Sequence, residues 1–152
     1  MTRRRRVVEL LRSPRDASLA VRMIGWALVL PILKFALPLP RLVRLLSSRR
    51  DTRARHPARE ARVSELAQLL YRSRRPGFAD NCLERSLVTY RYLGRLGADP
   101  SLTVAVGRDR SDVIGHVWVS VDGTPVHDAP DFLARYVPLI VFGSNGRAAS
   151  EV

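Results

Sequence analysis

Hydrophobic and polar positions change their spacing midway along the chain. Apolar residues recur at helical intervals in the first part, which predicts helices over 16–37, 42–48, 58–74 and 82–96. Later residues alternate instead, which predicts strands over 102–107, 115–121 and 125–128. Helices followed by an antiparallel sheet define an α+β fold, and a chain of 152 residues fits one compact core.

The stretch from 49 to 57 is charged, contains one alanine as its apolar residue and ends in proline, which is typical of a linker. It separates a basic, hydrophobic helical segment over 1–50 from a predicted core over 58–145. Residues 146–152 are expected to form a flexible tail. Within the first helix, Pro31 predicts a break or a kink.

The uncharged run over 23–33 follows an arginine-rich start and superficially mimics a signal peptide. It continues into prolines and Lys34 rather than a small-residue cleavage site, so secretion is not expected. As a membrane span, 23–39 is short and carries a lysine and two prolines, so packing against protein is favoured over a membrane contact. We expect a cytoplasmic protein in which residues 20–40 are the candidate for peripheral membrane contact.

The formal net charge of +12 lies entirely in the first half of the chain. Residues 1–75 hold 19 basic and 5 acidic groups, whereas residues 76–152 hold 7 and 9. Such an asymmetry suits nucleic acid, anionic lipid or an acidic protein. Nucleic-acid binding is disfavoured because the sequence shows no helix-turn-helix or base-stacking pattern. Every basic residue except Lys34 is arginine, a bias that GC-rich coding produces without selection for binding.

The chain has one cysteine, Cys82, which excludes an internal disulfide and a multi-thiolate zinc site. Asn81 can cap a helix that begins at Cys82, and Glu84 can reach back to complete a capping box. The amides and dipole at that helix start favour a thiolate and stabilise an oxyanion, so we expect Asn81 and Glu84 to support the site. The alternative for a lone cysteine is a small buried hydrophobe.

His116 and Asp128 follow on two successive predicted strands. Alternation over 115–121 puts the valines on the core face and His116 on the other face, where it suits a general base as well as an ordinary exposed histidine. A metal site built from Cys82, His116, His127 and Asp128 is a further alternative. The two histidines lack compact ligand spacing, so no metal and no cofactor are expected.

The loop between these strands decides whether the two side chains meet. A two-residue loop at Asp122 and Gly123 turns Asp128 towards the valine face, away from His116. A three-residue loop that adds Val121 and a G1 bulge sets His116 directly opposite Asp128. A functional pair therefore predicts the bulged hairpin, with Gly123 at positive φ.

Three motifs carry a resemblance to a known family: Cys82-Leu83-x-Arg85-Ser86-Leu87, Gly115-His116-x-Trp118-Val119 and Asp122-Gly123-x-Pro125-Val126-x-Asp128. Their order is that of papain-like and transglutaminase-like hydrolases. Over about residues 15–142 the chain resembles the transglutaminase-like peptidases of lasso-peptide biosynthesis, in their split, stand-alone form. The resemblance implies that Cys82 is the nucleophile, His116 the base and then the acid, and Asp128 the group that orients His116. Family members often have alanine in place of Val117 and glutamate in place of Ser120.

The resemblance also implies a function and its partners. The enzyme would remove the leader from a ribosomally made precursor, so that a separate cyclase can close the macrolactam. A separate recognition protein would capture the leader peptide, and the cyclase is a candidate partner. Transamidation or amine acylation on the same three residues is the alternative chemistry, because a triad does not encode the acceptor.

Overall fold

The computed structural model describes residues 13–48, 54–72 and 82–151. The helices are α2 (Pro14–Ala36), α3 (Leu39–Leu46), α4 (Pro57–Arg72), α5 (Cys82–Arg95) and α6 (Pro130–Leu133). The strands are β1 (Pro100–Asp109), β2 (Asp112–Val121), β3 (Thr124–Pro125), β4 (Tyr136–Phe142) and β5 (Ala148–Glu151). They form one five-stranded antiparallel sheet in the order β3-β2-β1-β4-β5, which confirms the α+β class.

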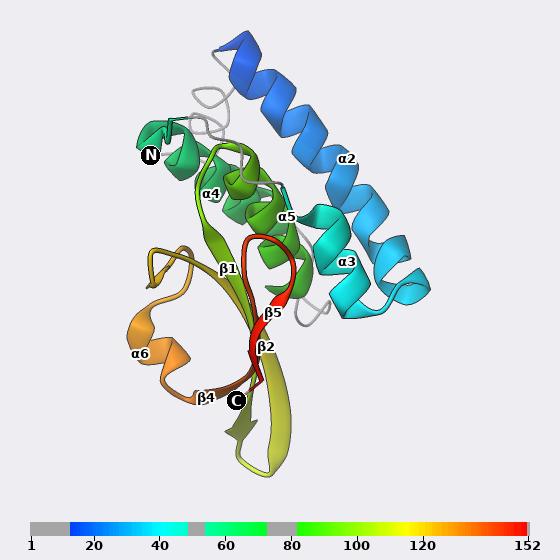
Figure 1. The fold of residues 1–152 in the computed structure, drawn as a ribbon, viewed down its shortest axis with the longest axis vertical. Coiled ribbons are helices and arrows are strands. Elements are labelled where there is room, and N and C mark those ends of the chain that lie inside the picture. The colour runs from blue at the N-terminus through cyan, green and yellow to red at the C-terminus, as the bar shows by residue number, and fades with distance from the viewer. Residues whose placement is uncertain (1–12, 49–53, 73–81, 152) are drawn as a thin grey trace.

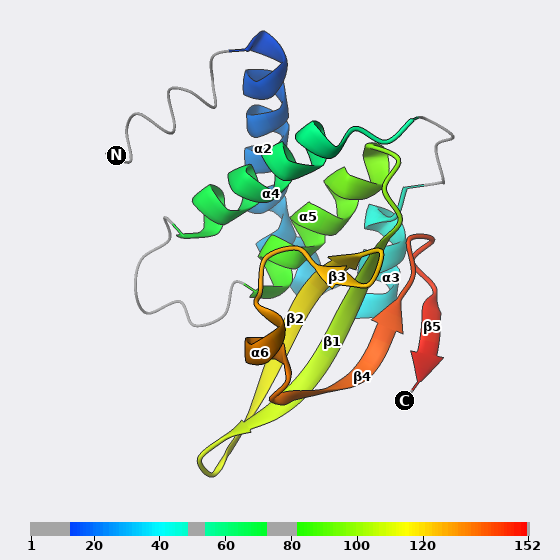
Figure 2. The ribbon, with the colours of Figure 1, turned by 90° about the vertical axis from the view of Figure 1, so that its left-hand side faces the viewer.

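Two layers of unequal size cover the sheet (Figures 1 and 2). Helices α2 to α5 lie on one side, where Val117 and Val119 of β2 join the main hydrophobic core. On the other side α6 and its loops cover a smaller cluster that contains Trp118 and Leu133. The valine face is therefore the core face, as the alternation predicts, and the His116 face is covered as well.

Helix α2 runs without interruption through Pro31. The hydroxyl of Ser13 caps its start by accepting a hydrogen bond from the Arg15 amide, with an N–O distance of 3.2 Å. Leu30 and Leu33, on either side of Pro31, both pack on the main core. Because this packing continues past the proline, the expected break at Pro31 is wrong.

Helix α5 starts and stops where the sequence signals lie. Cys82 is its first residue, and Gly97, with φ of 82°, follows its end. The amides of Gly97 and Ala98 donate to the carbonyls of Gly94 and Leu93, so the last turn closes as a Schellman motif. The predicted stop at Gly97 is confirmed.

The last residues do not form the expected tail. Ala148–Glu151 is the strand β5, which pairs with β4 at the edge of the sheet. The turn before it contains Gly146 at φ of 73°, where a Cβ would lie 2.7 Å from the Cα atom of Arg44 in α3. Glycine therefore lets this turn pack against α3, which was not visible from the local sequence.

Candidate active site

Cys82 lies half-buried at the start of α5, at the edge of the core that joins this helix to the sheet. Asn81, the expected cap, lies outside the described residues. The carboxylate of Glu84 is buried and accepts a hydrogen bond from the Lys34 ammonium of α2, with an N–O distance of 2.9 Å. Glu84 therefore ties the first turn of α5 to α2.

His116 projects from β2 into an aromatic setting on the α6 side of the sheet. The Tyr136 ring stacks on the imidazole with centroids 4.9 Å apart, and the Phe132 ring meets it edge-on at 5.3 Å. Trp118, two residues along the same face, lies 6.1 Å away. These rings leave 11% of the His116 side chain exposed, so the imidazole is held in place and largely shielded from water.

The imidazole joins the two other candidate residues. Its Nε2 atom lies 3.2 Å from Oδ2 of Asp128. The hydrogen bond with Asp128, followed by the influence of the nearby Cys82 thiol, raises the pKa of His116 to about 9 despite burial, which acts to lower it. The structure therefore pairs His116 with Asp128, and Cys82 is near enough to contribute to the raised pKa of His116.

A fourth side chain, Arg85 of α5, holds the other side of the Asp128 carboxylate. Its Nη2 atom lies 3.2 Å from Oδ1 and 3.1 Å from Oδ2 of Asp128. Burial acts to raise the pKa of Asp128, but the hydrogen bond from His116 and the charge of Arg85 hold it below its ordinary value. The carboxylate is thus ionised, and it is fixed from two directions.

The hairpin that leads to Asp128 has the two-residue loop, so the predicted bulge is wrong. Val121 pairs with Thr124, and both loop residues have positive φ, 52° at Asp122 and 77° at Gly123. The positive φ predicted for Gly123 is confirmed. Strand β3 ends at Pro125 rather than at Asp128: the Val126 amide still donates to the Val119 carbonyl of β2 (N–O distance 2.9 Å), and the backbone bends over 126–128. Asp128 is therefore not part of the strand pairing, so the register does not fix its orientation and its side chain can reach His116.

His127 anchors this bend to the helical layer. Its Nε2 atom lies 2.9 Å from Oγ1 of Thr89 in α5, and its Nδ1 atom lies 3.3 Å from Oγ of Ser64 and 3.2 Å from Nε2 of Gln68 in α4. Burial, and then the nearby charge of Arg85, lower the pKa of His127 to about 4. A neutral imidazole here fixes the backbone immediately before Asp128.

His127 lies within hydrogen-bonding distance of two hydroxyls and one amide. Its ring is therefore occupied by these groups and does not contact the His116 imidazole through them. Across the described ranges, no three His, Cys, Asp or Glu side chains gather where they could hold a metal ion. The alternative metal site of Cys82, His116, His127 and Asp128 is therefore not assembled in these ranges.

The sequence had assigned no function to several residues that shape this site. Arg85 lies in the first motif and, three residues after Cys82, shares its face of the helix. Tyr136 comes from β4, where it faces Gly107 of β1 across the sheet. A Cβ at Gly107 would lie 2.9 Å from the Tyr136 ring, so glycine makes room for the ring that stacks on His116.

A thiol at a helix start beside a histidine and a carboxylate, on an α+β core, defines a papain-like or transglutaminase-like arrangement. The model of the transglutaminase-like superfamily matches residues 11–141, and the chain belongs to this superfamily. Its members are generally cysteine peptidases or acyltransferases. Searches of the curated proteins and of the solved structures found no match.

Proposed function

We propose that this protein is a cysteine peptidase that removes the leader from a lasso-peptide precursor, with Cys82, His116 and Asp128 as its catalytic residues. The hydrogen bond between His116 and Asp128 carries the proposal, because it gives a proton carrier and its orienting carboxylate, and Cys82 at the start of α5 is near enough to raise the pKa of His116 as a nucleophile would. The motifs around these residues support the finer assignment to leader removal.

In the proposed reaction the Cys82 sulfur attacks the carbonyl carbon of the scissile bond, paired with the His116 imidazolium. His116 then gives its proton to the departing amine, which leaves as the new N-terminus of the core peptide. The leader stays on sulfur as a thioester. Water, deprotonated by His116, attacks this thioester, and the leader acid and the thiol are released. We expect the backbone amide of Cys82, at the start of α5, to stabilise the oxyanion.

Asp128 and Arg85 fit this proposal in different ways. Asp128 holds the Nε2 atom of the His116 imidazole, so the other ring nitrogen is left to exchange a proton with the thiol. Arg85 is a positioning residue that acts through Asp128. The proposed partners are the precursor leader peptide, a separate leader-recognition protein and the cyclase, and the proposed location is the cytoplasm.

The experiment combines the full chain with the precursor and the recognition protein encoded in neighbouring reading frames, and follows the products by mass spectrometry. We expect a leader ending in a free carboxylic acid and a core peptide with a new amine. Cys82→Ala and His116→Ala should each abolish cleavage while the circular dichroism spectrum is unchanged. Cleavage by Cys82→Ala at the wild-type rate would refute a thiol peptidase, and a leader joined to an added amine would show acyl transfer instead.

A further inference from the structure

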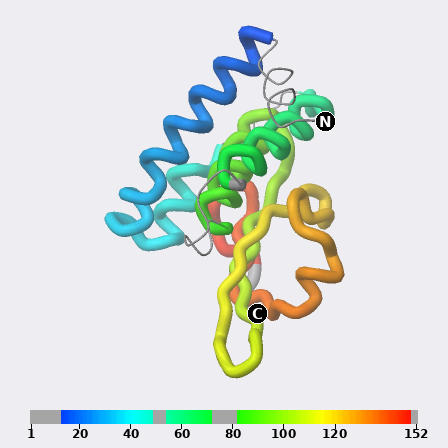
Figure 3. The backbone as a smooth tube through the Cα atoms, turned by 180° about the vertical axis from the view of Figure 1, so that it is seen from behind, coloured from blue at the N-terminus to red at the C-terminus, as the bar shows by residue number. Residues whose placement is uncertain are grey.

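Helix α2 carries an apolar stripe on the side that faces away from the core. Its members are large hydrophobic residues exposed at helical intervals, and we call them the α2 ridge: Val21, Ile24, Leu28, Val29, Ile32 and Phe35. Phe35 is 87% exposed and Ile32 is 70% exposed. The helix forms the outer flank of the molecule, distant from the tip of the β1–β2 hairpin (Figures 1 and 3). Contiguous apolar surface of this kind marks an interaction site.

The other side of α2 belongs to the folded core. Met23, Ala27 and Leu30 are buried, and the helix contacts α3, α4 and α5. By length and composition, with a mean hydropathy of 1.7, α2 is apolar enough to cross a membrane. Crossing would remove these three side chains from the core, so the folded protein can offer only the α2 ridge to an apolar medium.

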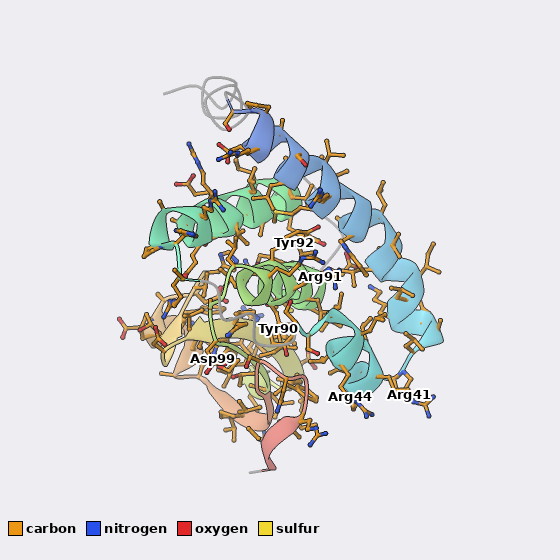
Figure 4. All side chains as sticks on the ribbon, turned by 45° about the horizontal axis from the view of Figure 1, so that its top comes forward. Arg41, Arg44, Tyr90, Arg91, Tyr92 and Asp99 are labelled. Atoms are coloured by element: carbon orange, nitrogen blue, oxygen red, sulfur yellow. The ribbon has the colours of Figure 1, made fainter. Side chains whose placement is uncertain are left out.

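Arginines border the ridge where α2 meets α5. A groove between the two helices is lined by Arg22, Trp26 and Val29 of α2 and by Tyr92 and Arg95 of α5. Figure 4 shows Arg91 and Tyr92 projecting from α5 towards α2, and the Arg91 guanidinium lies 4.3 Å from the centroid of the Trp26 ring.

These arginines lack an acidic partner within the described ranges. Among the residues that the structure describes, no carboxylate pairs with Arg22, Arg91 or Arg95, and the Nε atom of Arg91 is buried without a hydrogen-bond partner. Residues 1–48 as a whole contain ten basic and two acidic groups. The apolar ridge is therefore accompanied by an excess of positive charge that suits an anionic partner.

We propose that the α2 ridge and its bordering arginines bind the surface of an anionic lipid bilayer, with α2 lying in the plane of the membrane. From Val21 to Phe35 the ridge extends about 21 Å along the helix. It is convex, so it can sink into the acyl boundary of a deformable bilayer. Arg22 and Arg95 then reach the phosphates of the headgroups.

The chemistry of the ridge favours lipid over a protein partner. Between Leu19 and Leu37 the sequence contains two polar side chains, Arg22 and Lys34, and Lys34 is already paired with Glu84. Specific protein interfaces carry about one hydrogen bond per 100–200 Å², and the ridge offers no such donors or acceptors apart from its arginine. A bilayer requires none, because the acyl chains accept apolar side chains and the phosphates accept arginine.

The test measures flotation of the full-length protein with phosphatidylcholine vesicles that contain or lack phosphatidylglycerol. We expect binding to the vesicles with phosphatidylglycerol only. Ile32→Glu and Phe35→Ser should each weaken it by about tenfold or more, and Arg22→Gln with Arg95→Gln should weaken it about fivefold per removed charge. Val113→Glu is the matched control, because Val113 is 70% exposed, as Ile32 is, but lies on β2; it should bind as the wild type does.

Three outcomes would overturn the proposal. The first is a folded wild-type protein that does not float with anionic vesicles. The second is unchanged binding by both Ile32→Glu and Phe35→Ser, since arginines alone would then account for it. The third is a wild-type dimer in light scattering that Ile32→Glu converts to a monomer, because a second copy would then cover the ridge. None of these measurements depends on the peptidase reaction, so the proposed function is tested separately.

Discussion

The Nε2 atom of His116 lies 3.2 Å from Oδ2 of Asp128, although the two residues are not paired in the sheet. His116 belongs to β2, whereas Asp128 lies three residues beyond the end of β3. The contact therefore depends on the bend over 126–128 and on the side chains that hold it, rather than on a strand register. This dependence makes the site sensitive to residues that do not take part in the chemistry.

Replacing the carboxylate tests the contact directly. Asp128→Asn keeps the size of the side chain but removes the charge that raises the pKa of His116, so that pKa should fall from about 9. We expect the rate of precursor cleavage to drop by about three orders of magnitude, with a trace remaining. The pH–rate profile should move towards lower pH along with the His116 pKa. An unchanged rate and profile would show that Asp128 does not orient His116.

Arg85 is predicted to affect the rate of cleavage only through Asp128. Arg85→Gln removes the donor to both carboxylate oxygens and should slow cleavage about tenfold, because Asp128 is then held from one side. It should also raise the pKa of His127, which the Arg85 charge helps to lower. Proton NMR of the histidine rings measures this second effect, which a merely structural loss would not produce. Arg85→Lys, which keeps the charge, should restore the pKa of His127.

The candidate residues were predictable because their signals are local. The capping pattern of Asn81 and Glu84 predicts the helix start at Cys82, and strict alternation places His116 on the face opposite the valines. The register was not predictable from the same kind of signal. Asp122 and Gly123 suit a two-residue loop as well as a bulged one. The sequence also contains no signal that β3 ends after two residues.

The residues that hold the site were missed because their partners are distant in sequence. His127 contacts Ser64 and Gln68, which precede it by 63 and 59 residues. Tyr136 reaches His116 only because β4 pairs with β1. Neither contact produces a periodic pattern or a motif at short range, so a single sequence contains no signal for either.

Gly107 is predicted to control the position of the Tyr136 ring. In Gly107→Ala the new methyl group would lie 2.9 Å from Cδ1 of Tyr136 and 3.0 Å from the Arg135 carbonyl, so the ring must move away from His116. We expect a loss of about 1–3 kcal/mol in unfolding free energy and a several-fold slower cleavage. Urea unfolding and the histidine NMR spectrum measure the two effects.

Gly115 provides the matched control for that substitution. It lies on the neighbouring strand, where a Cβ would meet only the Ala105 carbonyl at 3.9 Å. Gly115→Ala should therefore leave the unfolding free energy and the His116 pKa close to their wild-type values. Equal losses in both variants would show that a general cost of alanine in this hairpin, rather than displacement of Tyr136, explains the Gly107 effect.

His127 should make the protein sensitive to acid. Its pKa is lowered from 6.5 to about 4 in the folded state, so the unfolded chain binds a proton first as the pH falls. The contribution of His127 to stability is therefore fully present above pH 6.5 and is lost as the pH falls through about 4. The loss amounts to about 3 kcal/mol at most. His116 has the opposite sign, since its raised pKa gives stability that is lost as the pH rises through about 9.

Urea unfolding at a series of pH values separates the two histidines. His127→Gln removes the titratable imidazole and part of the hydrogen bonding to Thr89. It should therefore lower the unfolding free energy at neutral pH but flatten the fall of that free energy between pH 6.5 and 4. His116→Gln should leave that acid limb in place and remove the decline on the alkaline side. If the acid limb is equally steep in His127→Gln, other groups cause it, and a neutral buried His127 is not what makes the fold sensitive to acid.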